Sequence, residues 1–241
     1  MSKKNKDGFE TRAIHAGQKA DPTTGAVMMP IYTSSTFEQE SPGVHKGFDY
    51  SRSANPTRKA FEECIASLEN GEAGFGFSSG VAAISACVEL LMPGDHVIAM
   101  NDLYGGTVRL FNEIKTLSQG IEVTYVDMTD IKNVEAAKTD KTKMIFVETP
   151  TNPLLKVVDL SAIADFAKSA NILSVCDNTF ASPYVQQPLE HGIDIVLHSA
   201  TKYLGGHSDL IAGALVIGRK DEELISPVSY THLTLPTNSL V

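Results

Sequence analysis

The chain has 241 residues, and its 42% hydrophobic and 20% charged residues are typical of a soluble globular protein with one large domain, or one domain with an extension. The net charge of −9 argues against a nucleic-acid partner, which would need a basic surface. No apolar run approaches the ~20 residues of a membrane span. The opening MSKKNKDGFE lacks the apolar core of a signal peptide, so we expect a cytoplasmic protein without a membrane partner.

Residues 1–50 are rich in Gly, Pro, Ser and Thr and show no sustained hydrophobic period. The stretch DPTTGAVMMPIYTSSTF, at 21–37, is not typical of a core element. The sequence therefore predicts an extended N-terminal arm that lies against another surface.

Helical and strand patterns alternate from about residue 55, and we expect one α/β domain over residues 51–225. The expected helices lie between Asn55 and Asn70 and over 79–91, 107–118, about 130–138 and about 160–167. Short apolar runs predict the strands, over 73–79, 96–100, 121–127, 143–148, 172–177, 194–198 and 213–218. Because helices separate the strands, crossover connections are needed, and a mostly parallel sheet with helices on both faces follows.

Ligands of such sheets bind beyond the carboxyl ends of the strands. Polar residues stand at several of these ends, namely Ser78-Ser79, Asn101-Asp102, Glu148, Asp177 and His198-Ser199. These positions are the first places to look for chemistry.

The glycine-rich run GFGFSSG, at 74–80, resembles a dinucleotide fingerprint, with Asp102 near the place of a ribose-binding acid. Its spacing is G-x-G-x-x-x-G, and two of the glycines fall inside the strand, which argues against a dinucleotide. A phosphate site is the better interpretation, because Gly80 and Val81 begin a helix whose exposed N–H groups attract anions. An ordinary Ser79 N-cap is the alternative.

Two further residues suggest a site for an aldehyde cofactor. Lys202 follows a strand end near the hydroxyl residues Ser199 and Thr201, and a lysine held there can become a nucleophile for an aldehyde. Taken alone, a plain surface lysine is the better interpretation. Asp177 ends a buried strand and could keep a pyridine nitrogen protonated, or form an Asx turn. Together with the phosphate site, and with Tyr104 as an aromatic face, this set matches pyridoxal 5′-phosphate (PLP).

The three cysteines, Cys64, Cys87 and Cys176, lie far apart and lack the paired spacing of metal ligands. Their odd number suits a reducing compartment. We expect small buried hydrophobic residues and no metal site.

Several motifs in order resemble the cystathionine γ-synthase / γ-lyase family of PLP-dependent enzymes. The resemblance covers about residues 9–225, and its runs are TRAIHAGQ (11–18), FDYSRSANPTR (48–58), FSSGVAA (77–83), DLYGGT (102–107), ETPTNP (148–153), DNTFASP (177–183) and HSATKYLGGHSD (198–209). It implies an aspartate aminotransferase-like fold and PLP-dependent metabolism of sulfur amino acids.

The resemblance also implies roles for individual residues. Lys202 would form the Schiff base and act as the catalytic base, Asp177 would pair with the pyridine nitrogen, and Tyr104 would stack on the ring. Thr179 would support Asp177. The phosphate would be held by Gly80, Val81, Ser199 and Thr201. Tyr50 and Arg52 would reach the phosphate of a neighbouring subunit, so a homodimer with shared sites, and a tetramer built from it, is expected. Asn152 would contact both the cofactor and the substrate carboxylate. Tyr50 would also contact the substrate, and Arg109 is a further candidate for which an exposed helix arginine is the alternative.

The implied reaction breaks or forms a carbon–sulfur bond at the γ-carbon of an amino acid. Cystathionine γ-lyase is the expected activity, with cystathionine γ-synthase or O-acetylhomoserine sulfhydrylase as alternatives. Gly106 stands where methionine γ-lyases carry cysteine, which argues against that activity. The segment 226–241 breaks the pattern and resembles translated vector sequence, so we expect a chain truncated at its C-terminus. A non-catalytic remnant is therefore the alternative from another class.

Overall fold

The computed structural model describes residues 7–218 and 224–229. The main sheet has seven strands in the order β3-β9-β8-β7-β6-β4-β5. Its strands are β3 (Ala73–Phe77), β4 (His96–Met100), β5 (Glu122–Val126), β6 (Thr142–Glu148), β7 (Leu173–Asp177), β8 (Ile195–His198) and β9 (Gly213–Ile217). The helical segments are α1 (Phe9–His15), α2 (Pro56–Leu68), α3 (Gly80–Val88), α4 (Gly105–Arg109), η1 (Leu110–Lys115), α5 (Thr116–Ser118), α6 (Ile131–Ala137), α7 (Leu160–Ala170), α8 (Ser182–Val185) and η2 (Pro188–His191).

The mostly parallel sheet that the sequence predicts is confirmed. β5, β4, β6, β7 and β8 run parallel to one another. β9 runs antiparallel to both β8 and β3, so β3 points the same way as the parallel strands. The carboxyl end of β3 therefore lies at the same edge of the sheet as the ends of β4, β6, β7 and β8.

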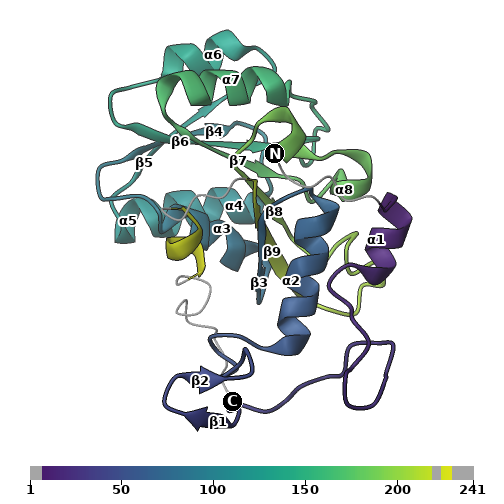
Figure 1. Ribbon diagram of the computed structural model, residues 1–241. Helices are drawn as coiled ribbons and strands as arrows, with labels where there is room; N and C mark the ends of the chain where they lie inside the picture. The colour runs from purple at the N-terminus through teal and green to yellow at the C-terminus, as the bar shows by residue number, and fades with distance from the viewer. Residues whose placement is uncertain (1–6, 219–223, 230–241) are drawn as a thin grey trace.

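Helices cover both faces of the sheet, as expected. Figure 1 shows α6 and α7 above the sheet and α3, α4 and α5 below it. The main core fills the space between these layers, and within it the rings of Phe111 and Phe146 meet edge to face with centroids 5.4 Å apart. α2 covers the other end of the sheet, where Ile65 and Ala66 pack against Ala214 and Val216 of β9.

The helix expected over 107–118 has an unexpected backbone register. α4 passes into the π-helix η1 and then into α5. The side chains of Phe111 and Lys115 are buried, and the Lys115 ammonium donates to Glu89 at the end of α3. The buried lysine is held by a residue distant in sequence, which a local helical pattern cannot show.

The expected N-terminal arm contains a helix that the sequence pattern missed. α1 buries none of its residues, and it is held instead by Arg12, whose guanidinium donates to the backbone carbonyl of Ser67 and to Asn70 Oδ1 at 2.8 Å. These acceptors lie at the C-terminal end of α2, where carbonyl groups are left without helical partners. Farther along, the arm forms the hairpin of β1 (Gln39–Ser41) and β2 (Val44–His45), which projects below α2 in Figure 1.

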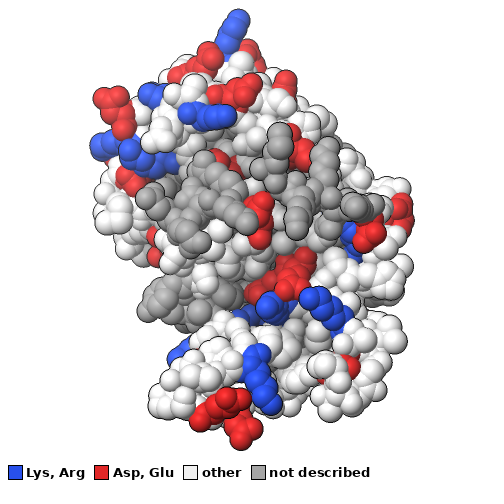
Figure 2. Space-filling model, viewed as in Figure 1, with Lys and Arg blue, Asp and Glu red and all other residues white. Residues whose placement is uncertain are grey.

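Charged side chains line the exposed surface of α2. Arg58 pairs with Glu62 at 3.2 Å and Lys59 with Glu63 at 3.8 Å, each one helical turn apart. Figure 2 shows acidic and basic side chains side by side over this helix. Such i,i+4 pairs add a few tenths of a kcal/mol each, about 0.2–0.5, so α2 is held mainly by its packing on β3 and β9.

Residues 224–229 extend across the predicted domain boundary at residue 225. They are helical, and Leu224 and Val228 are buried in the main core. The rest of the expected tail, 230–241, lies outside the described residues, so its origin stays a prediction. Among the helices described, none is long and apolar enough to cross a membrane.

Candidate active site

The polar strand ends named from the sequence come together at one edge of the sheet. Glu148 and Asp177 are register partners on β6 and β7, and Asp177 lies opposite Leu197, one residue before His198. Because β3 points the same way, the start of α3 reaches this edge too. The sheet topology therefore gathers residues from four separate sequence motifs.

The start of α3 is pressed against the residue that follows β8. A Cβ atom at Gly80 would lie 2.7 Å from the Cβ of Ser199, so only glycine fits without a shift of the backbone. Ser79 caps the helix by accepting the N–H of Ala82 at 3.1 Å. The N–H groups of Gly80 and Val81 have no acceptor within the described part of the chain. They are therefore free to bind an anion.

Asp177 is connected to this helix start through two hydrogen bonds. Its Oδ1 accepts the N–H of Thr179 at 2.9 Å, and the Thr179 hydroxyl accepts the N–H of Ser199 at 2.7 Å. Burial raises the pKa of Asp177, while the hydrogen bonds from Thr179 and the charge of His198 lower it. Asp177 is thus a buried carboxyl group held in a fixed orientation, and a cation would stabilise its charge.

Tyr104 lies between the end of β4 and α4, and the residue is 46% exposed. Its backbone N–H donates to Glu148 Oε2 at 2.9 Å. A Cβ atom at Gly106 would lie 2.3 Å from Cε1 of Tyr104, so this glycine gives the ring its space. The exposed ring can therefore stack on a planar ligand.

Lys202 and Thr201 lie in the turn after β8. The backbone N–H of Lys202 donates to the Ser199 carbonyl at 3.1 Å, which ties the turn to the phosphate-binding candidate, and its side chain is exposed. The Thr201 hydroxyl bonds to both the N–H and the carbonyl of Ala212, at 3.1 Å each. In this structure Thr201 fixes the turn against the chain that leads into β9.

The two remaining substrate candidates on the domain are exposed. Asn152 follows β6 in the loop 149–157. Arg109 ends α4, and its Nε donates to the Gly105 carbonyl of the same helix at 3.4 Å. Their expected contacts are with a substrate, so their roles stay predictions.

Tyr50 and Arg52 belong to the arm. The Arg52 guanidinium lies over the Tyr50 ring, 5.0 Å from its centroid, and Tyr50 forms an isolated bridge with Thr36. Within the described chain neither side chain is hydrogen-bonded to another predicted site residue. That Tyr50 and Arg52 bind the phosphate in a neighbouring subunit stays a prediction.

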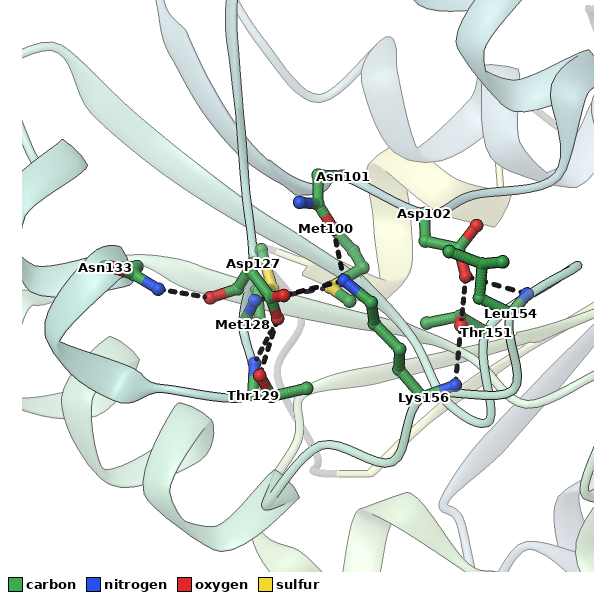
Figure 3. Close-up of polar contacts among 10 residues, drawn as sticks. All are labelled: Met100, Asn101, Asp102, Asp127, Met128, Thr129, Asn133, Thr151, Leu154 and Lys156. Carbon is green, nitrogen blue, oxygen red and sulfur yellow. Dashed lines mark hydrogen bonds and ion pairs between the residues drawn. The ribbon is translucent and has the colours of Figure 1, made fainter.

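Sequence reasoning named Glu148 and Asp102 as strand ends but gave neither a role in this site. Asp102 accepts hydrogen bonds from the Thr151 hydroxyl and from the N–H of Leu154, the latter at 3.0 Å, and so holds the loop that carries Asn152 (Figure 3). Both residues are buried, at 8% exposed for Asp102 and 5% for Glu148. Their position at the ends of apolar strands was the available signal.

Glu69 gave no signal in the sequence. It follows α2 and is fully buried, and its Oε1 accepts from Asn178 Nδ2 at 2.8 Å and contacts His198 Nε2 at 2.6 Å. Glu69 thereby links Asn178, which follows Asp177, to His198, which precedes Ser199. A glutamate at a helix end usually lies in water, so only the tertiary contacts reveal it.

None of the three cysteines is among the predicted site residues. All three cysteines are free; Cys87 and Cys176 are buried and Cys64 is half-buried. In the described residues no group of three or more His, Cys, Asp or Glu side chains is arranged to hold a metal ion.

The residues at this edge fit PLP. The two free N–H groups at the start of α3 suit a phosphate, and the buried carboxyl group of Asp177 suits a protonated ring nitrogen. Lys202 offers an amine, and its backbone N–H is bonded to Ser199, which is connected to both groups. The exposed Tyr104 ring adds a stacking surface.

Comparison with known proteins agrees with this assignment. The model of the Cys/Met metabolism PLP-dependent enzyme family matches residues 10–234. The chain belongs to this family. The family resemblance inferred from the sequence, the aspartate aminotransferase-like fold class and the PLP dependence are confirmed.

Individual relatives carry different names. A cystathionine beta-lyase of Coxiella burnetii is 59% identical over 213 residues, 88% of this chain and 55% of the relative. A cystathionine gamma-lyase of Bacillus subtilis is 53% identical over 217 residues, 89% of this chain and 57% of the relative. The crystal structure of cystathionine gamma-lyase from Lactobacillus plantarum complexed with L-serine has a TM-score of 0.90 at 51% identity, and covers 94% of this chain and 58% of that one. The chain thus spans little more than half the length of these relatives.

Proposed function

We propose that this member of the family takes part in trans-sulfuration, cleaving or forming a carbon–sulfur bond at the γ-carbon of a sulfur amino acid, with cystathionine γ-lyase activity as the first choice. The observation that carries the proposal is the hydrogen-bonded series from Asp177 through Thr179 to Ser199, which lies against Gly80. It connects a carboxyl group with a phosphate-binding helix start across two strand ends.

The residues would divide the work as follows. PLP, when bound, supplies an electron sink for the substrate carbon. The Lys202 amine would hold the cofactor covalently and then remove the proton from Cα. Asp177 would keep the pyridine nitrogen charged, Tyr104 would cover the ring, and Gly80, Val81, Ser199 and Thr201 would bind the phosphate. Asn152, Arg109 and Tyr50 would orient the substrate.

The experiment that tests the proposal compares the protein with Lys202→Ala. The wild-type protein should retain PLP through dialysis with a visible absorption band and should release a 2-oxo acid from cystathionine. Lys202→Ala should lose both, while the exposed Lys132→Ala should keep both. A wild-type protein that takes up no PLP would overturn the proposal.

The product identifies the reaction. Release of 2-oxobutanoate indicates γ-elimination, whereas pyruvate indicates β-elimination, an alternative favoured by the name of the Coxiella burnetii relative. Cystathionine formed from an activated homoserine and cysteine would indicate the synthase. If the protein produces no oxo acid and no replacement product, it is a non-catalytic remnant.

We also propose a cytoplasmic homo-oligomer in which the arm serves a neighbouring site. Exposed apolar side chains support this, since Val27, Met28 and Ile31 of the arm are 70–82% exposed. Mixing Arg52→Ala with Lys202→Ala subunits should restore activity that neither variant has alone. Equal inactivity of the mixture would contradict sharing of sites between subunits.

A further inference from the structure

The carboxyl group of Glu148 has no part in the proposed chemistry, yet it lies in the middle of the site. Glu148 and Asp177 are register partners on neighbouring parallel strands, which run about 4.8 Å apart. Their side chains therefore project on the same face of the sheet. Glu148 is 5% exposed and Asp177 is 6% exposed. Two carboxyl groups buried so close together resist carrying two negative charges at once.

The groups around the pair make its two members unequal. Asp102, at the end of β4, adds negative charge beside Glu148. His198 of β8 is the neighbour whose charge lowers the pKa of Asp177. The buried thiols of Cys87 on α3 and Cys176 on β7 have raised pKa values, chiefly through burial, so they add no charge at neutral pH.

Hydrogen bonds act on both members of the pair. Burial raises the pKa of Asp177, and the hydrogen bonds from the hydroxyl and the backbone N–H of Thr179 oppose that rise. Burial, followed by the charge of Asp177, raises the pKa of Glu148 to about 8, although the N–H groups of Tyr104 and Asn152 oppose the shift. Glu148 has the charges of Asp177 and Asp102 as neighbours, whereas Asp177 has the favourable charge of His198, so the surroundings favour the proton on Glu148 and the negative charge on Asp177.

We propose that Glu148 is a positioning residue: a neutral acid that fixes the backbone at Tyr104 through Oε2 and, by holding the proton of the buried pair, leaves Asp177 charged. Oε2 accepts the N–H of Tyr104 at 2.9 Å, and the carbonyl oxygen of a neutral acid can accept this hydrogen bond as a carboxylate oxygen does. A carboxylate at this position would compete with Asp177 for every cation in the site. The neutral acid therefore allows Asp177 to stay negatively charged, and it also holds the backbone at Tyr104.

The proposal deepens the proposed PLP site, but its main test needs no cofactor. Glu148→Gln has the shape of the neutral acid and no titrating proton. Urea unfolding of the full chain without PLP, measured from about pH 5 to about pH 8, would show how the free energy of unfolding depends on the proton of Glu148. The pKa of Glu148 is higher in the folded protein than in the unfolded chain. The folded state therefore gains stability from the Glu148 proton at low pH and loses it as the pH rises toward 8.

In the wild-type protein the linked proton should raise the unfolding constant by about tenfold per pH unit across this window. Relative to wild type, Glu148→Gln should lose that slope, whereas the control Glu113→Gln, exposed on η1, should keep it. Parallel pH profiles for wild type and Glu148→Gln would overturn the proposal, whether or not the protein binds PLP.

Two further measurements cover a variant that fails to fold. Infrared difference spectra of the wild-type protein should show a protonated carboxyl band that disappears with a midpoint near pH 8, and absence of that band at neutral pH would contradict the proposal. Among variants that fold, Glu148→Gln should bind PLP at least about fivefold more tightly than Glu148→Ala, because Ala leaves the Tyr104 N–H without an acceptor. Equal affinities would also contradict it.

Discussion

Gly106 shows how one absent side chain can orient another. A Cβ atom at this position would lie 2.3 Å from Cε1 and 3.0 Å from Cζ of Tyr104. The Tyr104 ring is exposed enough to move, so a larger residue would displace the ring before it disturbed the core. The glycine at 106 therefore sets where the ring stands above the site.

We expect Gly106→Ala to weaken PLP binding by roughly 10-fold while changing stability by less than about 1 kcal/mol, because α4 tolerates alanine and the exposed ring moves. Gly105→Ala is the matched control, since a Cβ there meets nothing within 4 Å. Titration with PLP and urea unfolding measure the two effects. Equal PLP affinity for the two variants would show that the ring position does not matter.

At the scale of elements, the loop 149–157 is held by the ends of two other strands. Figure 3 shows Asp102, after β4, bonded to Thr151 and Leu154, and Lys156 reaching from the loop to Asp127, after β5. The Lys156 ammonium lies 2.6 Å from Asp127 Oδ2. The position of Asn152 thus depends on the connections of β4 and β5.

The Lys156–Asp127 pair should stabilise this loop in a pH-dependent way. Hydrogen bonds from Lys156 and then from Thr129 lower the pKa of Asp127 to about 2. Since the folded pKa is depressed, the contribution is present above about pH 4 and is lost as pH falls toward 2. Asp127→Asn should cost no more than about 1 kcal/mol, because the pair is partly exposed.

Hydrogen exchange can locate that effect. In Asp127→Asn the amide of Lys156, which donates to the Thr151 hydroxyl at 2.9 Å, should exchange several-fold faster at neutral pH. Glu122→Gln, which breaks the exposed Glu122–Lys141 pair, should leave that amide unchanged. An unchanged rate in Asp127→Asn would mean that the ion pair does not hold the loop.

The sequence could predict the parts of this architecture that depend on local pattern. Asp177 stood out because it ends an apolar run, and Gly80 because it begins a helix. The pairing of Glu148 with Asp177 needs the order of the strands, which no local pattern specifies. α1 was missed for the same reason, because Arg12 holds it to Ser67 and Asn70 across more than fifty residues.

At the scale of the whole molecule, Glu69 joins the two layers that carry the site. It lies after α2, and its Oε1 binds both Asn178, next to Asp177, and His198, next to Ser199. Asn178 also donates to the Gln186 carbonyl at 2.8 Å, and Gln186 donates to Thr149 at 3.0 Å. One buried carboxyl group therefore couples α2 to the ends of β7 and β8 and, through Gln186, to the end of β6.

We expect Glu69→Ala to destabilise the whole fold by about 1–3 kcal/mol, because it leaves the buried His198 Nε2 without a partner. Removing both partners should cost less than the sum of the single changes, so the double variant with His198→Ala should show a coupling of about 1 kcal/mol or more. Urea unfolding measures each corner of the cycle, with the exposed Glu135→Gln as a control. Additive losses would mean that the two side chains act independently. A lower midpoint with an unchanged urea dependence would instead place the loss in the native contacts, since an altered slope reports a change in the surface exposed on unfolding.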